Sequence, residues 1–336
     1  RGRRAAPPAG GRAGAGPPRT ASDPVLGERE GGPSAAGPPP DRGEDGAALG
    51  ARVTRPRKGP ALMLLATAMF TAMVACVKVA RDEMGPLEVI VWRAVFSVPL
   101  TLLLVRKIGF RVKAKKVLAL RILLGFGAMV CFFTSTRGLN LGDLSIISRL
   151  QPIVVAFLAP IALGSAEKAS GKIWGLLLLG LLGCALIIGP GLQVGNVYGL
   201  WALAATMFSA GAHLAVRKLG ATDDPRKVVL YFQAGACVLA LGAHAGMTGE
   251  LLPLPPAHLW WALGGVGLFA TLGQVAMTYA YQAERASVVA AASYAAPVFG
   301  MVADVLFFDG WPTGTALLGG AIVVGAGLVL VFGKER

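Results

Sequence analysis

Charged side chains stand inside several long apolar runs of this sequence, and they are the residues best placed to do chemistry. Arg93 lies well inside one run, and Arg149 lies one turn before Pro152 in another. A charge inside a bilayer is costly and usually faces a cavity or a partner, and a guanidinium binds a carboxylate or phosphate through two hydrogen bonds. Arg93 and Arg149 therefore indicate a polar cavity for an anion. The alternative is that they pair with Glu88 or Asp304 and hold helices together.

The other ionisable residues of the apolar runs have simpler interpretations. Lys78 and Glu88 lie near the ends of their runs, where long side chains reach back to the interface, although Lys78 remains a candidate for the cavity. Arg121 lies near the end of its run and is expected at the interface. His213 is expected to be a packing residue, but an ordinary pKa of about 6.5 also suits proton coupling, with Asp304 as a second candidate.

Motifs for catalysis or metal binding are missing from the sequence. We find no HExxH, no Gly-x-Ser nucleophile with a histidine partner inside an apolar run, no pair of intramembrane aspartates and no Walker A loop. The four cysteines fall in different apolar runs without a CxxC pair and are expected to be free thiols. We therefore expect no catalytic residue, no metal and no cofactor. A membrane-embedded enzyme and an accessory scaffold without transport activity remain the alternative functions.

The composition places these residues in a membrane protein. Of 336 residues, 54% are hydrophobic and 15% are charged, against roughly 45–50% and 25% in soluble domains. A spanning helix needs about 20 mostly apolar residues. The sequence predicts an all-α membrane protein with ten transmembrane helices, near residues 61–80, 86–105, 117–136, 143–163, 172–189, 197–216, 227–246, 258–281, 287–308 and 314–332.

Residues 1–59 differ from the rest of the chain. They carry 11 basic residues, 6 acidic residues and 23 glycines and prolines, with no aromatic residue. Such a segment cannot bury enough apolar surface to offset its conformational entropy. We expect a disordered Pro/Gly/Arg-rich cytoplasmic tail, and a mis-started translation is an alternative to a regulatory arm.

Loop charges predict the orientation, because short cytoplasmic loops are rich in Lys and Arg. The segment before the first helix and the second and sixth loops are basic, whereas the odd-numbered loops are nearly uncharged, which places both termini in the cytoplasm and requires an even number of helices. Much of the net charge of +14 lies in the tail and these loops, so we expect no nucleic-acid partner. The basic residues are Arg52, Arg55, Arg57 and Lys58 before the first helix, Arg106, Lys107, Arg111, Lys113, Lys115 and Lys116 in the second loop, and Arg217, Lys218, Arg226 and Lys227 in the sixth.

The two halves of the apolar region resemble each other weakly. An offset of 145 residues pairs Pro152 with Pro297 and Ser148 with Ser293. Each match falls on the fourth and fifth helices of a five-helix half, and because five is odd the halves must cross the membrane in opposite directions. Pro152 and Pro297 are expected to kink equivalent helices. Small residues spaced by four are expected to pack helices closely, namely Gly171 with Gly175, Ala316 with Gly320 and Ala321 with Gly325.

Several segments together resemble a known family. They are ACVKVAR, WRAVFSVPLTLLL, RGLNLGDLSIISRLQPIVVAFLAPIALGSAEK and YQAERASVVAAASYAAPVFGMVADVLFFDGWP. The chain resembles the drug/metabolite transporter superfamily, in particular its EamA-type members, over residues 60 to 333. The resemblance implies one five-helix repeat over 60–190 and a second over 191–333. The family's small residue, proline and acid are matched by Gly142, Pro152 and Glu167, and then by Ser287, Pro297 and Asp309.

The resemblance also implies a function. Members of the family are secondary-active transporters that work by alternating access, and many export their substrates. The family's cavity positions correspond here to Gln151, Gln274, Tyr279, Tyr281, Ser293 and Tyr294. With Arg93 and Arg149 this predicts export of a small polar metabolite, anionic or zwitterionic, across the inner cell membrane. The expected partners are the metabolite and the lipid bilayer, with a homodimer as an open option.

Overall fold

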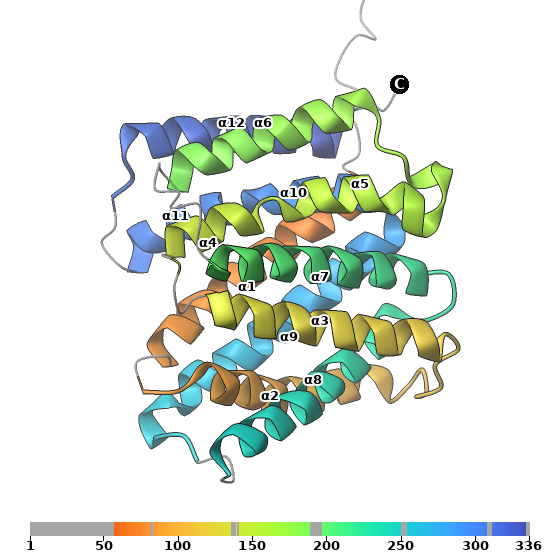
Figure 1. Cartoon of the computed structure of the whole chain (residues 1–336), viewed down its shortest axis with the longest axis vertical. Coiled ribbons are helices and arrows are strands. Elements are labelled where there is room, and N and C mark those ends of the chain that lie inside the picture. Colours follow the sequence, from red (N-terminus) through yellow and green to blue (C-terminus); the bar gives the residue numbers. More distant parts are fainter. Residues whose placement is uncertain are drawn as a thin grey trace, which may run out of the picture. The chain divides into compact units, whose positions relative to one another are not determined.

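The structure is a computed structural model that describes residues 57–80, 83–135, 139, 141–188, 197–249, 254–307 and 311–333. Almost all of the expected tail at 1–59 lies outside the described residues, as does Asp309. The described part is helical, with no strand within those ranges. Its helices (Figure 1) are α1 Lys58–Ala80, α2 Pro86–Val105, α3 Lys115–Ser135, α4 Leu141–Ser148, α5 Gln151–Leu163, η1 Ser165–Glu167, α6 Gly171–Ile188, α7 Val197–Leu219, α8 Pro225–Thr248, η2 Ala257–Leu259, α9 Trp260–Ala283, α10 Ala286–Ala292, η3 Ser293–Ala295, α11 Ala296–Phe307 and α12 Gly314–Phe332.

The helices have the length and composition of membrane spans. Nine segments of the described residues are long and apolar enough to cross a bilayer, counting α4 with α5 and α10 with α11 as one span each. The predicted helix at 117–136 corresponds to α3, which is 21 residues long. At about 1.5 Å per residue, 21 residues reach across a hydrocarbon core of about 30 Å. The chain is an all-α membrane protein that crosses the bilayer several times.

Helix packing follows the two-fold relation of the halves. Helix α1 packs on α9, and α3 packs on α7, so the first helix of each half meets the third helix of the other. The second helices meet as α2 on α8, the fourth as α5 on α10, and the fifth as α6 on α12 (Figure 1). Most of the packing therefore joins one half to the other, as in two interlocked repeats.

The two halves run in opposite directions. Arg57, just before α1, pairs with Glu284, which follows α9. Arg217, in the last turn of α7, donates to the carbonyl oxygen of Gln282 in α9 at 2.9 Å. The start of α1 and the end of α7 therefore lie at the same end of the helices, and the first helix of one repeat is antiparallel to the first helix of the other.

The fourth span of each half is broken beside its proline. Helix α4 ends at Ser148 and α5 begins at Gln151, which puts Pro152 in a first turn, where a missing N–H costs little. In the second half η3 separates α10 from α11, and Pro297 stands in the first turn of α11. Side chains of other helices bond to the backbone at the breaks: Thr206 Oγ1 donates to Ile147 O at 3.3 Å, and Cys184 Sγ to Tyr294 O at 3.5 Å.

Close helix contact depends on glycines other than those expected from the spacing. A Cβ on Gly319 of α12 would lie 2.5 Å from the carbonyl oxygen of Gly183 in α6. No atom lies within 4 Å of a Cβ placed on Gly171, Gly175 or Gly325, so the expectation of close packing at those three positions is wrong. The spacing of four identifies residues on one helix face, but it does not say which face meets a neighbour.

This contact predicts the effect of a larger side chain. Gly319→Val is expected to lower the free energy of unfolding by about 1–3 kcal/mol, because overpacking must push α6 away from α12. Gly325→Val on the same helix is the matched control and is expected to change little. Thermal unfolding of both variants in detergent checks this, and equal melting temperatures for the two would contradict it.

A carboxylate holds the loop between α2 and α3. Asp223, 7% exposed, accepts hydrogen bonds from the backbone N–H of Lys113 at 2.7 Å and of Ala114 at 3.0 Å, and from Thr222 Oγ1 at 2.7 Å. Burial by itself raises the pKa of Asp223, but the hydrogen bonds from Thr222, Lys113 and Ala114 lower it, and the net pKa lies below the ordinary 3.8. The charged form therefore ties the first repeat to the loop before α8.

The lowered pKa predicts an acid-dependent loss of stability. A carboxylate whose pKa is lower in the folded state stabilises fully above its unfolded pKa of about 3.9, and this stabilisation is lost as the pH falls through the folded value. Asp223→Asn should remove that component, so its stability should fall less than that of the wild type as the pH drops below about 4. Unfolding measured between pH 6 and pH 3 tests this, with the exposed Asp304→Asn as control; parallel curves for wild type and Asp223→Asn would count against it.

Candidate functional site

Four polar side chains from α2, α3, α8 and α9 meet among apolar helices. Arg93 Nη2 donates to Gln233 Oε1 at 3.1 Å, and Arg121 Nη2 donates to Gln274 Oε1 at 3.5 Å. Arg121 is 4% exposed and Gln233 is fully buried. The two guanidinium groups lie within electrostatic range of each other. We call these four residues the arginine cluster.

The expectation that Arg121 lies at the membrane interface is wrong, because the structure buries this side chain between helices. Its guanidinium carbon is 3.9 Å from the centre of the Phe232 ring, which is a cation–π geometry. One turn along α3, a Cβ on Gly125 would collide with Arg121 Nη1 and with the Phe232 ring, so this glycine leaves room for the guanidinium. The position of Arg121 in the sequence of α3 indicates how deep it lies in the membrane. Its burial depends instead on which face of α3 it occupies, and the sequence does not show that.

The arginine cluster has more hydrogen-bond donors than acceptors. The Nε atoms of Arg93 and Arg121 and the Nε2 of Gln233 are buried without a hydrogen-bond partner. The structure does not contain the alternative pairing with Glu88 or Asp304, because Glu88 accepts from the N–H of Gly85 and Asp304 is exposed. The other carboxylates whose side chains the structure describes also bond elsewhere: Glu83 with His258, Glu167 with Arg217, Glu284 with Arg57, Asp223 with the loop before α3, and Asp224 with Arg226. An unpaired buried donor is costly. The unpaired N–H groups of the arginine cluster could be satisfied by a hydrogen-bond acceptor, and an anion would satisfy them best.

A second polar group adjoins the cluster. Gln151 Nε2 lies 2.5 Å from His213 Nδ1, and the Tyr281 ring stacks on the His213 ring with centres 4.8 Å apart. These side chains come from α5, α7 and α9. Arg121 lies within electrostatic range of both His213 and Tyr281. The group of Gln151, His213 and Tyr281 therefore lies close enough to the arginine cluster to feel the charge of Arg121.

Arg149 lies at the break between α4 and α5. Its Nε is buried without a hydrogen-bond partner, and the side chains that interact with it electrostatically are Cys184 of α6 and Tyr294 of η3. The 145-residue offset makes Arg149 and Tyr294 equivalent positions of the two repeats. The side chains of the two helix breaks thus lie within electrostatic range of each other.

The remaining predicted residues lie apart from these groups. Lys78 is exposed in the last turn of α1, and Asp304 is exposed on α11. Ser293 donates its hydroxyl to the carbonyl of Ala290 at 2.7 Å, within its own span. The structure therefore places Arg93 and Gln274 in the arginine cluster through their partners Gln233 and Arg121. It also groups Gln151 with His213 and Tyr281, and puts Tyr294 within electrostatic range of Arg149, whereas Lys78, Asp304 and Ser293 are not among the residues of these groups.

Sequence reasoning missed Arg121 and Gln233. An amide in the middle of the apolar run of α8 was a usable signal for Gln233, since its polar atoms need partners in a membrane. No signal identified the partner of Arg93, because a single sequence does not say which faces of α2 and α8 meet.

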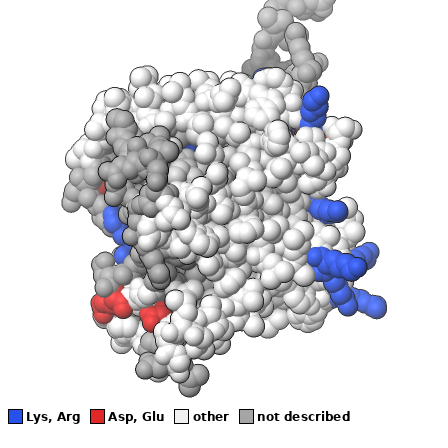
Figure 2. Space-filling model, in the orientation of Figure 1, with Lys and Arg blue, Asp and Glu red and all other residues white. Residues whose placement is uncertain are grey.

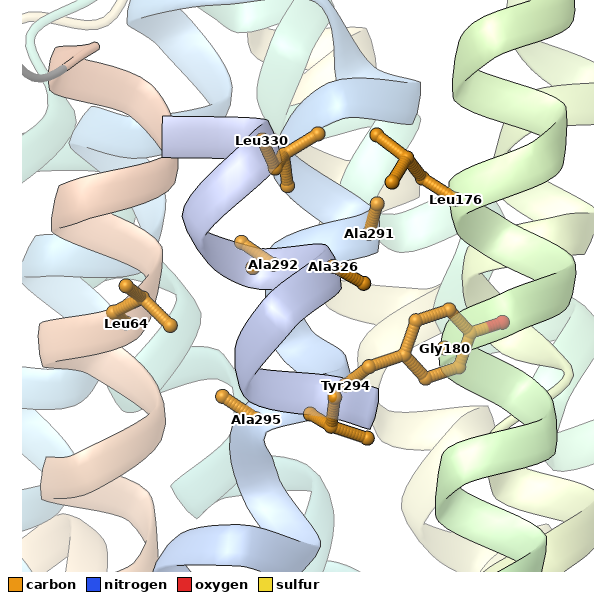
Figure 3. A pocket seen from close by; sticks show the side chains of 11 residues that line it. Leu64, Leu176, Gly180, Ala291, Ala292, Tyr294, Ala295, Ala326 and Leu330 are labelled. Carbon is orange, nitrogen blue, oxygen red and sulfur yellow. The ribbon is translucent and has the colours of Figure 1, made fainter. Parts of the chain in front are cut away.

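A small pocket between α1, α6, α10 and α12 has a different character (Figure 3). Its lining is apolar apart from Tyr294, whose ring lies beside Gly180. A Cβ on Gly180 would lie 2.6 Å from that ring, so the glycine admits the tyrosine. This pocket has no charged group in its lining and is separate from the arginine cluster. It is lined by Leu64, Leu176, Gly180, Ala291, Ala292, Tyr294, Ala295, Val323, Ala326, Gly327 and Leu330.

Ion pairs join the two repeats at one end of the helices. Glu167 Oε1 accepts from Arg217 Nε at 2.7 Å, and its Oε2 accepts from the N–H of Ala286 at 2.8 Å. Arg57 and Glu284 form a second pair there. We call Glu167, Arg217, Arg57 and Glu284 the end latch. Figure 2 shows several groups of Lys and Arg at the edge where α3 begins, and at the opposite edge acidic side chains together with a few basic ones.

Comparisons with known proteins decide the family. Residues 57–189 and 197–333 each match the EamA-like transporter family. The chain belongs to this family. It is 30% identical to the pseudopaline exporter CntI of Pseudomonas aeruginosa over 277 residues, which cover 82% of this chain and 96% of that one. The human solute carrier family 35 member G1 is 27% identical over 280 residues, 78% of this chain and 75% of that one.

Other relatives agree with the assignment. The riboflavin transporter of Vibrio cholerae is 30% identical over 164 residues, 47% of this chain and 52% of that one. A crystal structure of another protein superposes with a TM-score of 0.69 at 18% identity, covering 80% of this chain and 96% of that one, which shows a shared fold. The protein is a membrane transporter of the drug/metabolite type, with small-molecule substrates.

The end latch predicts that replacing Arg217 lowers the stability of the protein more than replacing Arg226. Arg217→Gln removes the charged partner of Glu167, whose side chain is 8% exposed and keeps only the hydrogen bond from the N–H of Ala286, and breaking a buried pair costs about 3–5 kcal/mol. Arg226→Gln breaks a surface pair with Asp224, which is worth about 0–1 kcal/mol. Unfolding of both variants in detergent checks this, and an equal loss for both would contradict a structural role for the latch.

Proposed function

We propose that the chain is a secondary-active carrier that exports a small anionic or zwitterionic metabolite, which binds in the arginine cluster. The observation that carries the proposal is a pair of guanidinium groups, the buried one of Arg121 and the half-buried one of Arg93, with buried, unpaired Nε atoms and no carboxylate partner among the described residues. A carboxylate oxygen satisfies such donors through charge-assisted hydrogen bonds. Gln233 and Gln274 orient the guanidinium groups, and the amide of Gln233 offers a further donor.

The arrangement of the repeats supports alternating access. Two inverted repeats give two related gates around a site between them, and the cluster takes its residues from α2 and α3 of one repeat and α8 and α9 of the other. The breaks beside Pro152 and Pro297 provide places where helices can bend. Outward transport is supported by the relative that is named as a pseudopaline exporter.

We assign the basic end to the cytoplasm of a cell with an inner membrane, because cytoplasmic loops retain Lys and Arg. The end latch is then the cytoplasmic gate. His213 is the candidate for proton coupling, since it lies between Gln151 and Tyr281 beside the arginine cluster, and the exposed Asp304 is the second candidate. The proposed partners are the metabolite and the bilayer, with no nucleic acid; a homodimer stays an open option. The proposal includes no enzymatic step.

The function predicts that Arg121→Gln separates transport from stability. Each charge-assisted hydrogen bond to a ligand is worth about 1.5–3 kcal/mol, so uptake into proteoliposomes should fall about tenfold to a hundredfold. Removing an unpaired buried charge should not lower the stability of the ligand-free protein. Labelled glutamate, succinate and citrate are the probes. Saturable uptake by wild type that Arg121→Gln leaves unchanged would refute the site, and no saturable uptake by wild type would refute the carrier.

A glycine pair tests the same site without changing a charge. Gly125→Ala is expected to displace Arg121 and weaken uptake, because its Cβ would collide with the guanidinium. Gly127→Ala is the control, since its Cβ would meet the Phe208 ring at 3.5 Å, an ordinary contact. Uptake by both variants, normalised to the amount of folded protein, gives the comparison. Equal uptake by the two variants would argue against a role for Arg121 in binding.

A further inference from the structure

We propose that the transported molecule carries two separate anionic groups, one bound by the arginine cluster and one by Arg149, so that the preferred substrate is a dicarboxylate. This rests on the proposed function and narrows its substrate class. Arg149 has the same signature as the cluster, namely a buried Nε without a partner. The hydroxyl of Tyr294, which lies within electrostatic range of Arg149, is also buried without a partner.

No acid of the described residues neutralises Arg149. The side chains that interact with it are a thiol and a phenol, those of Cys184 and Tyr294. The ion pairs found in the described ranges involve Arg57, Arg217, Arg226 and His258 instead. Arg149 is half-buried with its Nε fully buried, and holding an unneutralised guanidinium inside the helices is costly. A ligand that brings one negative charge offsets only part of this cost.

Arg149 and the arginine cluster are separate centres. Arg149 interacts with residues of α6 and η3, whereas the cluster lies between α2, α3, α8 and α9. Figure 1 shows α6 and α8 on opposite sides of the helices that separate them, α5, α7 and α3. One compact anion therefore cannot satisfy both centres.

Polar side chains connect the two centres. Gln151 lies two residues after Arg149 and contacts His213, and His213 lies within the electrostatic range of Arg121. A chain-like molecule with a carboxylate at each end matches this arrangement. Its ends meet guanidinium groups, and its middle part passes Gln151 and His213, which can bond a hydroxyl or amine.

Binding measurements with matched acids test the proposal. The probes are glutarate, adipate and suberate, the monomethyl ester of each, and glycerol 3-phosphate as a doubly charged single group. Binding is measured by thermal stabilisation of the purified protein in detergent. The proteins are the wild type, Arg149→Gln, Arg149→Lys, Arg121→Gln and, as control for loss of a surface charge, Lys218→Gln, which removes an exposed lysine.

At least one diacid should bind the wild type and Lys218→Gln about tenfold or more tightly than its ester, the value of one further charged hydrogen bond. In Arg149→Gln the diacid and the ester should bind alike, with the ester unaffected. Arg149→Lys should keep part of the preference, because lysine keeps the charge and loses the two-donor fork. Arg121→Gln should weaken both.

Other outcomes overturn the proposal. Equal binding of diacid and ester by the wild type does so, as does an Arg149→Gln variant that weakens both acids equally. The proposal is also overturned if glycerol 3-phosphate binds as tightly as the best diacid and Arg149→Gln does not weaken its binding. The site would then recognise two charges on one group and not two separate groups. If the wild type binds neither diacids nor esters nor the phosphate, the proposed function fails as well; if esters bind without a diacid preference, only this inference fails.

Discussion

Three arginines, the buried Arg121 and the half-buried Arg93 and Arg149, place unpaired Nε atoms inside the helix bundle, and none of them forms an ion pair with a carboxylate whose side chain the structure describes. A buried charge without a partner costs several kcal/mol, so packing elsewhere must offset it. The glycine contact between α6 and α12 and the interlocked helix pairs of the two repeats provide that packing. A cost of this kind is typical of functional sites, where stability is given up for binding.

The inverted repeat explains how the charges come to share one interior. Arg93 and Arg121 stand on the second and third helices of the first repeat, and their amide partners stand on the corresponding helices of the second. The packing of α2 on α8 and on α9, and of α3 on α8, brings these helices together. Arg149 and Tyr294 occupy equivalent positions at the two helix breaks and lie within electrostatic range of each other. A movement that exchanges the conformations of the repeats would therefore act on all of these contacts.

Sequence patterns predicted where the helices lie better than they predicted which side of each helix packs against a neighbour. Apolar length predicted the spans, and the proline offset of 145 residues relates the two helix breaks. Depth in an apolar run singled out Arg93 and Arg149, both of which the structure buries at Nε. The burial of Arg121 and the close approach at Gly319 depend on which side of a helix meets a neighbour, and neither depth nor a spacing of four contains that information. Spans that are apolar on all sides are only weakly amphipathic, so their hydrophobic pattern does not show which side packs against a neighbour either.

The Nε–H groups of Arg93 and Arg121 are the most direct reporters of anion binding. In protein labelled with nitrogen-15 arginine, each Nε–H signal can be assigned by an Arg→Lys substitution and followed by NMR as adipate is added. If the arginine cluster binds the carboxylate, both signals should move downfield in proton shift and saturate together, because each donor gains a charged acceptor. Signals of Arg93 and Arg121 that stay unchanged at adipate concentrations that saturate uptake would contradict the site.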